Sequence, residues 1–247
     1  MLIRLHDPSF LPKHLIKWLA ALRPLLEQRE YIENLIQDEP RLTNIAKELA
    51  AFLQEHEIVG YHCTKEPEPG HFLRHGLRKL DNKSHRSEFL ARYSDKFSPA
   101  GLADLKEAWA LEFTRNRDRH CNGQLWFCFS PQLVSDGGTE LFFRYMGGEA
   151  IYHCLPRESE ALHTLEQLGV SVVVETAIRV SDIVHSAYPL EHGALSHYHQ
   201  TINPNAFLQE SAGYVTNGIP PERILRVIPR DDFLKAVGLR DDATTEQ

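Results

Sequence analysis

Residues 170–180 carry the strongest strand signal in the chain, because they read Val-Ser-Val-Val-Val-Glu-Thr-Ala-Ile-Arg-Val. β-Branched side chains fit the pleated surface of a sheet, and polar and apolar residues alternate toward the end of this run. A sheet is therefore the central expectation for this chain. The other segments predicted as strands are residues 58–64, 125–130, 149–155, 213–216 and 224–228.

The N-terminal quarter shows a helical pattern instead. From residue 12 to about residue 56, apolar side chains recur at spacings of three and four, which is typical of amphipathic helices. Two or three helices fit this stretch, with a break at Pro40, because proline cannot continue a helix interior. Further short helices are predicted at residues 70–75, 139–146 and 159–168.

These elements predict an α+β fold with two parts. Residues 1–56 form an N-terminal helical extension, which serves as scaffold, lid or partner-binding surface. Residues 57–240 form the main domain. Within it, residues 81–120 are strongly charged and are predicted as a helical insertion with two exposed helices.

The composition narrows the class of protein. A chain of 247 residues can bury a core of its own, and its four cysteines form no CxxC pair. Four cysteines without a CxxC pair fit reduced thiols better than a disulfide scaffold. Neither a signal peptide nor a membrane-spanning run is recognisable. The net charge of -7 argues against broad capture of nucleic acid, although it leaves room for a local basic patch. We therefore expect a cytoplasmic protein without membrane association.

The most informative motif is Tyr61-His62-Cys63-Thr64, which is followed by the segment His-Phe-Leu-Arg-His-Gly-Leu-Arg at residues 71–78. It predicts a strand that delivers His62 into a pocket, then a short helix stopped by Gly76. This arrangement resembles the opening motif of the ADP-ribosyltransferase superfamily, in its His-Tyr-Glu type found in toxins and defence proteins. The resemblance is close over residues 58–80 and looser elsewhere, where the order of elements and the segment Ile219-Pro220-Pro221 also fit.

The resemblance implies two small sheets around a cleft that grips NAD in a bent shape. His62 would then hold a ribose of NAD, and the residues beside it, Cys63 and Thr64, would face the nicotinamide amide. Tyr145, or in its place Tyr152, would stack on the nicotinamide ring. For each of these side chains, a role in the protein core is the alternative.

Two arginines near the first motif, Arg74 and Arg78, are candidates for contacts with the pyrophosphate of NAD. A guanidinium group matches phosphate oxygens with two parallel hydrogen bonds. A solvated helix face is the alternative for both side chains.

The reaction implied by the resemblance also needs a carboxylate, since positive charge develops on the ribose carbon as nicotinamide leaves. Glu210 is the acidic residue nearest to the Pro-Pro segment on its N-terminal side, although Ala212 occupies the position where the family pattern places the acid. Glu149 and Glu175 are the possible substitutes. Each of the three has a solvated or capping role as its alternative.

These residues lead to three hypotheses about function. The first is an NAD-dependent glycosyl transfer that moves ADP-ribose to a protein or nucleic-acid acceptor and releases nicotinamide. The second is a catalytically silent module of the same fold, which binds NAD, ADP-ribose or a partner protein at the N-terminal helices. The third is a metal-dependent hydrolase that uses His192, His197 and His199, although we expect this segment to be a surface loop and predict no metal.

Overall fold

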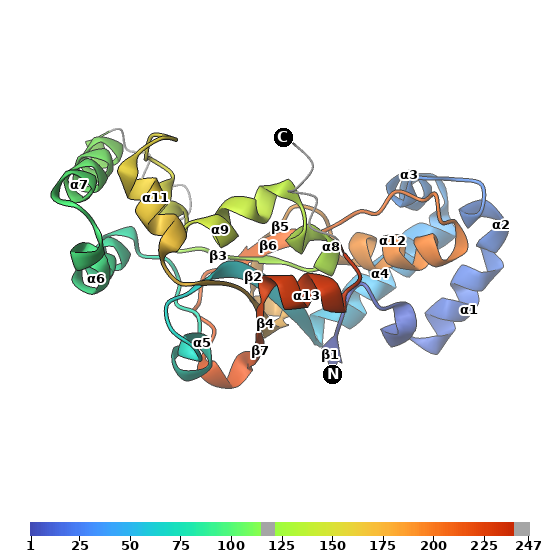
Figure 1. Ribbon diagram of the computed structural model, residues 1–247. Helices are drawn as coiled ribbons and strands as arrows, with labels where there is room; N and C mark the ends of the chain where they lie inside the picture. Colours follow the sequence, from blue (N-terminus) through green and yellow to red (C-terminus); the bar gives the residue numbers. More distant parts are fainter. Residues whose placement is uncertain (115–121, 240–247) are drawn as a thin grey trace. The chain divides into compact units, whose positions relative to one another are not determined.

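The computed structural model describes residues 1–114 and 122–239, and it has the predicted α+β composition (Figure 1). The described strands are β1 (Leu2–Ile3), β2 (Glu57–Glu66), β3 (Leu125–Cys128), β4 (Val170–Arg179), β5 (Ile183–Ser186), β6 (Ala212–Val215) and β7 (Ile224–Pro229). Four of the predicted helical segments are found as α5 (His71–His75), α6 (Asn82–Tyr93), α7 (Pro99–Thr114) and α11 (Glu160–Gln167). None of the helices in the described ranges is both long and apolar enough to span a bilayer.

Strand pairing joins the described strands into one seven-stranded sheet of order β5-β6-β3-β2-β4-β7, with β1 added beside β2. The pairs β2/β3, β4/β7 and β5/β6 are antiparallel, whereas β1 runs parallel to β2. The sequence led us to expect two small sheets. One continuous sheet forms because β2 and β4 are each ten residues long, so that different parts of each strand can pair with different neighbouring strands.

The chain divides into two compact units that do not follow the boundary predicted after residue 56. The first unit consists of residues 1–61, 126–133 and 177–215, and the second of residues 62–114, 122–125, 134–176 and 216–239, as far as they are described. The chain crosses from one unit to the other within β2, β3 and β4. The N-terminal helices therefore share a unit with chain segments that follow much later.

In the first unit, helix α12 (Leu190–Ile202) packs against the N-terminal helices (Figure 1). These helices are α1 (Lys13–Ala21), α2 (Arg23–Leu26), α3 (Ile32–Asp38) and α4 (Pro40–Gln54). The stretch thus holds four helices where two or three were expected, and the predicted break is found at Pro40, the first residue of α4. The expectation of a surface loop around His197 was wrong, because α12 is a helix with a largely buried face. His199 is fully buried and hydrogen-bonds the Leu26 carbonyl oxygen at 2.8 Å.

The burial of His197 makes the stability of the protein sensitive to acid. Burial, with a smaller contribution from the charge of His6, lowers the pKa of His197 from 6.5 to about 4. The unfolded chain therefore takes up a proton before the folded one does. As the pH falls from about 6.5 to 4, we expect the free energy of unfolding to decrease, by about 3 kcal/mol at pH 4 from this group alone.

Urea denaturation between pH 7 and pH 4 measures this loss. His197→Met is expected to flatten the pH dependence, because the variant has no group to protonate at this position. His192→Met, on the same helix but less buried, serves as the matched control and is expected to keep the wild-type slope. Equal slopes for His197→Met and wild type would contradict the assignment.

The second unit has a core of its own, to which α6, α7 and α11 contribute. Its buried members are Phe89, Phe97, Leu105, Trp109, Tyr145, Met146, Ile151, Tyr152, Leu155, Ala161, Leu162 and Leu165. The amphipathic helix α11 begins at the cap Ser159, whose side chain accepts from the Leu162 amide. The charged stretch at residues 81–120 is helical as predicted over its described part, and residues 115–120 lie outside the described residues. The expectation that both helices are exposed was wrong, because Phe89 on α6 and Trp109 on α7 are buried in this core.

One predicted strand is a helix instead. Residues 149–155 begin with helix α10 (Glu149–Tyr152), directly after two glycines with positive φ, 95° at Gly147 and 71° at Gly148. The two glycines redirect the chain, and Ala150, Ile151 and Tyr152 are then all buried. Consecutive apolar residues do not distinguish a strand from a buried helical turn, which explains the error.

Candidate functional site

The motif around His62 lies on the second half of β2 and alternates in burial. His62 and Thr64 are half-buried and face the same side of the strand, whereas Cys63 and Lys65 face the other side and are buried. This follows from the two-residue period of a strand. The His62 and Thr64 side chains therefore point to the same side of β2.

The helix after the motif ends as predicted at Gly76 and is held against a remote segment. Leu77 and Ile219 exchange two backbone hydrogen bonds of 2.8 and 2.7 Å, which form an isolated antiparallel bridge. Gly76 has a φ of 69°, and a Cβ atom at this position would lie 2.1 Å from the Ile219 carbonyl oxygen. Only glycine fits here, so the Gly-Leu end of the first motif and the Pro-Pro segment form one structure.

The loop between β2 and α5 carries an ionic cluster. The Glu66 side chain, 7% exposed, accepts a hydrogen bond from the Phe72 amide at 3.3 Å. The Glu68 carboxylate meets His71 at 3.1 Å and both Arg74 and Arg92 at 3.4 Å, and these contacts lower the pKa of Glu68.

The second arginine predicted to bind pyrophosphate, Arg78, pairs with Glu88 at 2.5 Å. Both predicted arginines thus have a carboxylate partner, and their side chains remain 52% (Arg74) and 71% (Arg78) exposed. Exposed ion pairs contribute little to stability, so an incoming phosphate can compete for these guanidinium groups.

Glu149 is the first residue of α10, and side chains from other helices hydrogen-bond the backbone around it. The carbonyl oxygen of Gly147 is hydrogen-bonded by His85 at 2.7 Å, and that of Ala150 by Arg86 at 2.9 Å. The Ile151 carbonyl oxygen accepts a hydrogen bond from the Trp109 indole N–H at 3.0 Å. Side chains of α6 and α7 therefore hold the backbone on both sides of Glu149, which limits its positions.

The two tyrosines predicted to stack on nicotinamide lie in the core of the second unit. Tyr145 is 8% and Tyr152 is 5% exposed, and their ring centroids are 5.3 Å apart. Tyr145 directly follows helix α9 (Glu140–Arg144), whose last residue contacts its ring through a cation–π interaction at 5.4 Å. Little of either ring surface is open to a ligand, and both rings pack as core residues.

The other acidic candidates have partners on different elements. Glu210, in the first unit, accepts a hydrogen bond from the buried Ser130 hydroxyl at 2.9 Å. Glu175 lies on β4 and is 1% exposed, and Arg226 on β7 binds both of its carboxylate oxygens, at 2.7 and 2.9 Å. Of the predicted catalytic acids Glu149 and Glu210, only Glu149 shares a unit with His62.

The predicted histidine cluster does not form a metal site. On a helix, side chains two positions apart point in different directions, so His197 and His199 diverge. In the described ranges no group of three His, Cys, Asp or Glu residues is arranged to hold a metal ion. The metal-dependent hydrolase is therefore not supported by the site it was based on.

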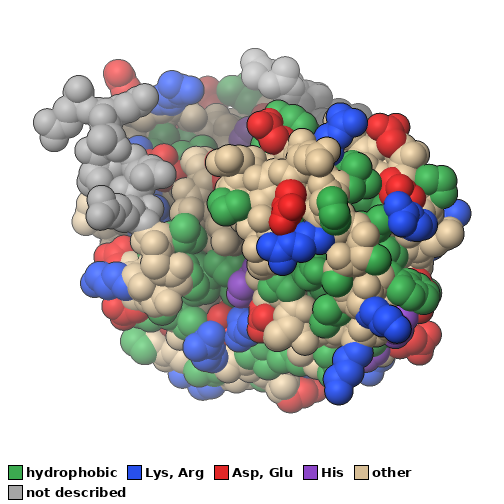
Figure 2. All heavy atoms as spheres, turned by 90° about the vertical axis from the view of Figure 1, so that its right-hand side faces the viewer, with side chains coloured by type: hydrophobic (Ala, Val, Ile, Leu, Met, Phe, Trp, Pro, Cys, Tyr) green, Lys and Arg blue, Asp and Glu red, His purple; other side chains and the backbone are tan. Residues whose placement is uncertain are grey.

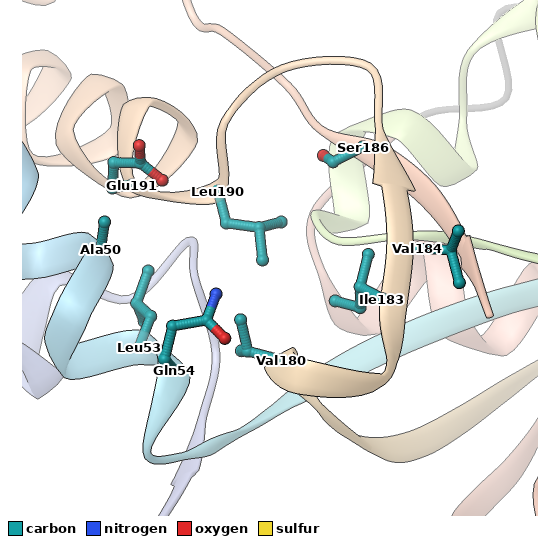
Figure 3. Close-up of a pocket in the computed structure, with 9 residues that line it drawn as sticks. All are labelled: Ala50, Leu53, Gln54, Val180, Ile183, Val184, Ser186, Leu190 and Glu191. Atoms are coloured by element: carbon teal, nitrogen blue, oxygen red, sulfur yellow. The ribbon is translucent and has the colours of Figure 1, made fainter.

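A small pocket of about 180 Å³ lies in the first unit, between the end of α4, strand β5 and the start of α12 (Figure 3). Its lining residues include Leu53, Val180, Ile183 and Leu190, which are apolar, with the Gln54 amide pointing inward. None of the residues predicted as site residues lines this pocket.

Pattern reasoning missed several polar residues of the second unit. The Lys65 ammonium donates to the carbonyl oxygens of Arg144 at 3.3 Å and Glu166 at 2.5 Å, at the C-terminal ends of α9 and α11, where a cation is favoured. Burial lowers the pKa of Lys65. Neither this lysine nor the side chains that brace Glu149 had a signal in the sequence, because their partners are remote in the chain.

Comparison of the chain with protein families, with curated proteins and with solved structures found no match.

Proposed function

We propose that the protein transfers ADP-ribose from NAD to a macromolecular acceptor in the cytoplasm and releases nicotinamide. The observation that carries this proposal is the bridge between Leu77 and Ile219, which joins the two segments most similar to the ADP-ribosyltransferase superfamily. They lie far apart in the chain, so their pairing is a tertiary feature that sequence similarity alone does not require. The fold of that superfamily is part of the proposal.

The proposal assigns roles to residues of β2 and to the two arginines that follow it, whereas the buried Tyr145 and Tyr152 have none. On the open side of β2, His62 holds a ribose of NAD, while Thr64 and the backbone of Cys63 contact the nicotinamide amide. Arg74 and Arg78 exchange their carboxylate partners for the pyrophosphate. These groups fit a dinucleotide, since they offer hydrogen-bond donors for hydroxyl groups and exposed guanidinium groups for phosphates.

Glu149 is the catalytic carboxylate in this proposal. The bond between the nicotinamide nitrogen and the ribose carbon breaks, and its electron pair leaves with nicotinamide. An acceptor atom then bonds to the same carbon through its lone pair and releases its proton. The carboxylate of Glu149 stabilises the positive charge that develops on the ribose, and its braced backbone keeps it in place during the step.

The test of this proposal compares two histidine variants. His62→Ala is expected to lower the rate of nicotinamide release at least about a hundredfold, because a misplaced ribose loses its alignment with the carboxylate. His75→Ala, at an exposed position on α5, is the matched control and should retain the wild-type rate. The measurement is release of nicotinamide from labelled NAD, with circular dichroism as the check of folding. A folded wild-type protein that neither releases nicotinamide nor transfers label would overturn the proposal.

A second candidate function is a catalytically silent module of the same fold, which binds NAD or ADP-ribose, or a partner protein at the N-terminal helices. Tyr31 and Phe207 stack with ring centroids 5.6 Å apart and remain 45% and 53% exposed. Trp18 on α1 is also 45% exposed, and Figure 2 shows hydrophobic side chains among scattered charges of both signs. Exposed aromatic residues are enriched in protein interfaces. Calorimetry that detects NAD or ADP-ribose binding without turnover would favour this module.

A further inference from the structure

Positive charge is concentrated in one short part of an acidic chain. Residues 71–92 contain six Lys and Arg but only two Asp and Glu, which gives this segment a net charge of +4 in a protein whose net charge is -7. The segment covers α5, α6 and the loop between them. Five of its cations are exposed, and we call them the basic surface: Arg74, Arg78, Lys79, Lys83 and Arg92.

The ion pairs of this surface leave its charge in excess. Glu68 is shared by Arg74 and Arg92 at 3.4 Å each, so a single carboxylate faces two guanidinium groups and brings α5 and α6 together. Lys79 and Lys83 flank Asp81, whose carboxylate accepts the Ser84 amide at 2.8 Å as the N-cap of α6. The carboxylates therefore hold the cations of the basic surface in position, but they are too few to neutralise its positive charge.

The exposed side of α6 carries two cations of the basic surface, Lys83 and Arg92, and one carboxylate, Glu88. Its exposed residues are Lys83, Ser84, Ser87, Glu88, Ala91 and Arg92. The Ser87 hydroxyl donates to the Lys83 carbonyl oxygen at 2.9 Å, so the side chains of this face that can contact phosphate oxygens are Lys83 and Arg92. This face carries no large apolar side chain of the kind that anchors a helix in a bilayer, which argues against a lipid surface.

We infer that the macromolecular acceptor is a nucleic acid whose phosphate backbone docks on the part of the basic surface outside the proposed NAD site, at Lys79, Lys83 and Arg92. This inference rests on the proposed transferase activity, since it names the acceptor of that reaction. Arg74 and Arg78, the members of the basic surface that belong to the proposed NAD site, lie in the same compact unit as His62 and these three cations. Attraction by the local positive charge also explains how an acidic protein can bind a polyanion.

The test uses fluorescence anisotropy of the full-length protein with labelled single-stranded RNA and DNA of one sequence, across a range of salt concentrations. Wild type is expected to bind at least one of them, with an affinity that falls steeply as salt rises. Lys79→Glu/Lys83→Glu is expected to reduce the affinity at least about tenfold and the salt slope by about 1.4, because two phosphate contacts to a single strand are lost. Lys13→Glu/Lys17→Glu on α1 makes the same charge change elsewhere and should bind as wild type.

Transfer of label from NAD to the oligonucleotide and nicotinamide release without an oligonucleotide are measured in parallel. The inference predicts that Lys79→Glu/Lys83→Glu loses the transfer but keeps the basal release. It is overturned if wild type fails to bind either oligonucleotide at low salt, if both double variants bind alike, or if polyglutamate or anionic vesicles compete equally well. Binding without any nicotinamide release would instead refute the proposed function and leave the docking surface standing.

Discussion

Glu149→Gln is expected to lower the rate of nicotinamide release about a thousandfold, the largest effect on activity predicted for a single substitution. The amide has the shape of the carboxylate but no charge to offset the cation that forms on the ribose. The hydrogen bonds from His85 and Arg86 reach backbone carbonyl oxygens and do not depend on the Glu149 side chain. The turn should therefore persist, and NAD affinity measured by calorimetry should change little.

Glu210→Gln provides the comparison for this prediction. Glu210 was the first choice by position in the sequence, but it lies in the first unit and bonds Ser130. The neutral amide still has an oxygen that accepts this hydrogen bond, so we expect an activity within a few-fold of wild type. If Glu210→Gln were the inactive variant and Glu149→Gln the active one, the catalytic carboxylate would be assigned to the wrong unit of the protein.

Arg226→Met is expected to have the largest effect on stability, lowering the free energy of unfolding by roughly 3–5 kcal/mol. Glu175 and Arg226 are directly opposite in the β4/β7 pair, and the guanidinium group binds both carboxylate oxygens. The Glu175 side chain is only 2% exposed, whereas that of Arg226 is 58% exposed. Removing the arginine leaves a charge on the buried side, where water cannot replace the lost partner.

The double variant Glu175→Met/Arg226→Met separates this effect from a simple loss of packing. Because neither charge remains, most of the stability lost in Arg226→Met should return. Urea denaturation of wild type, both single variants and the double variant gives the coupling energy. A double variant as unstable as Arg226→Met would show that the charge of Glu175 is not the cause.

The elements that the sequence alone predicted are those with a local signal. Periodicity placed the N-terminal helices and their break at Pro40, and β-branched residues placed β4. Glycines with positive φ ended α5 and α11 where expected, at Gly76 and Gly169. In each case the residues that determine the element lie within it or next to it, so short-range pattern rules suffice.

The predictions of secondary structure were wrong where packing against segments remote in the chain determined it. The segment around His197 is a helix because α3 and α4 cover it, and α10 is a helical turn because α6 and α7 bind its carbonyl oxygens. For the candidate site, too, the sequence predicted only a relation between residues that are close in the chain. The sequence determined that His62 and Thr64 share one face of a strand, a consequence of the two-residue period.

Only the tertiary structure decided which other candidate residues lie in the same compact unit as His62 and Thr64. It placed Glu149 in the same unit as His62 and Glu210 in the other, and it buried the rings of Tyr145 and Tyr152 in a core. It also joined Leu77 to Ile219, far apart in the chain. Such contacts depend on the packing of whole elements, because the free energy that selects them comes from burial and hydrogen bonding between distant segments and leaves no periodic trace in the sequence.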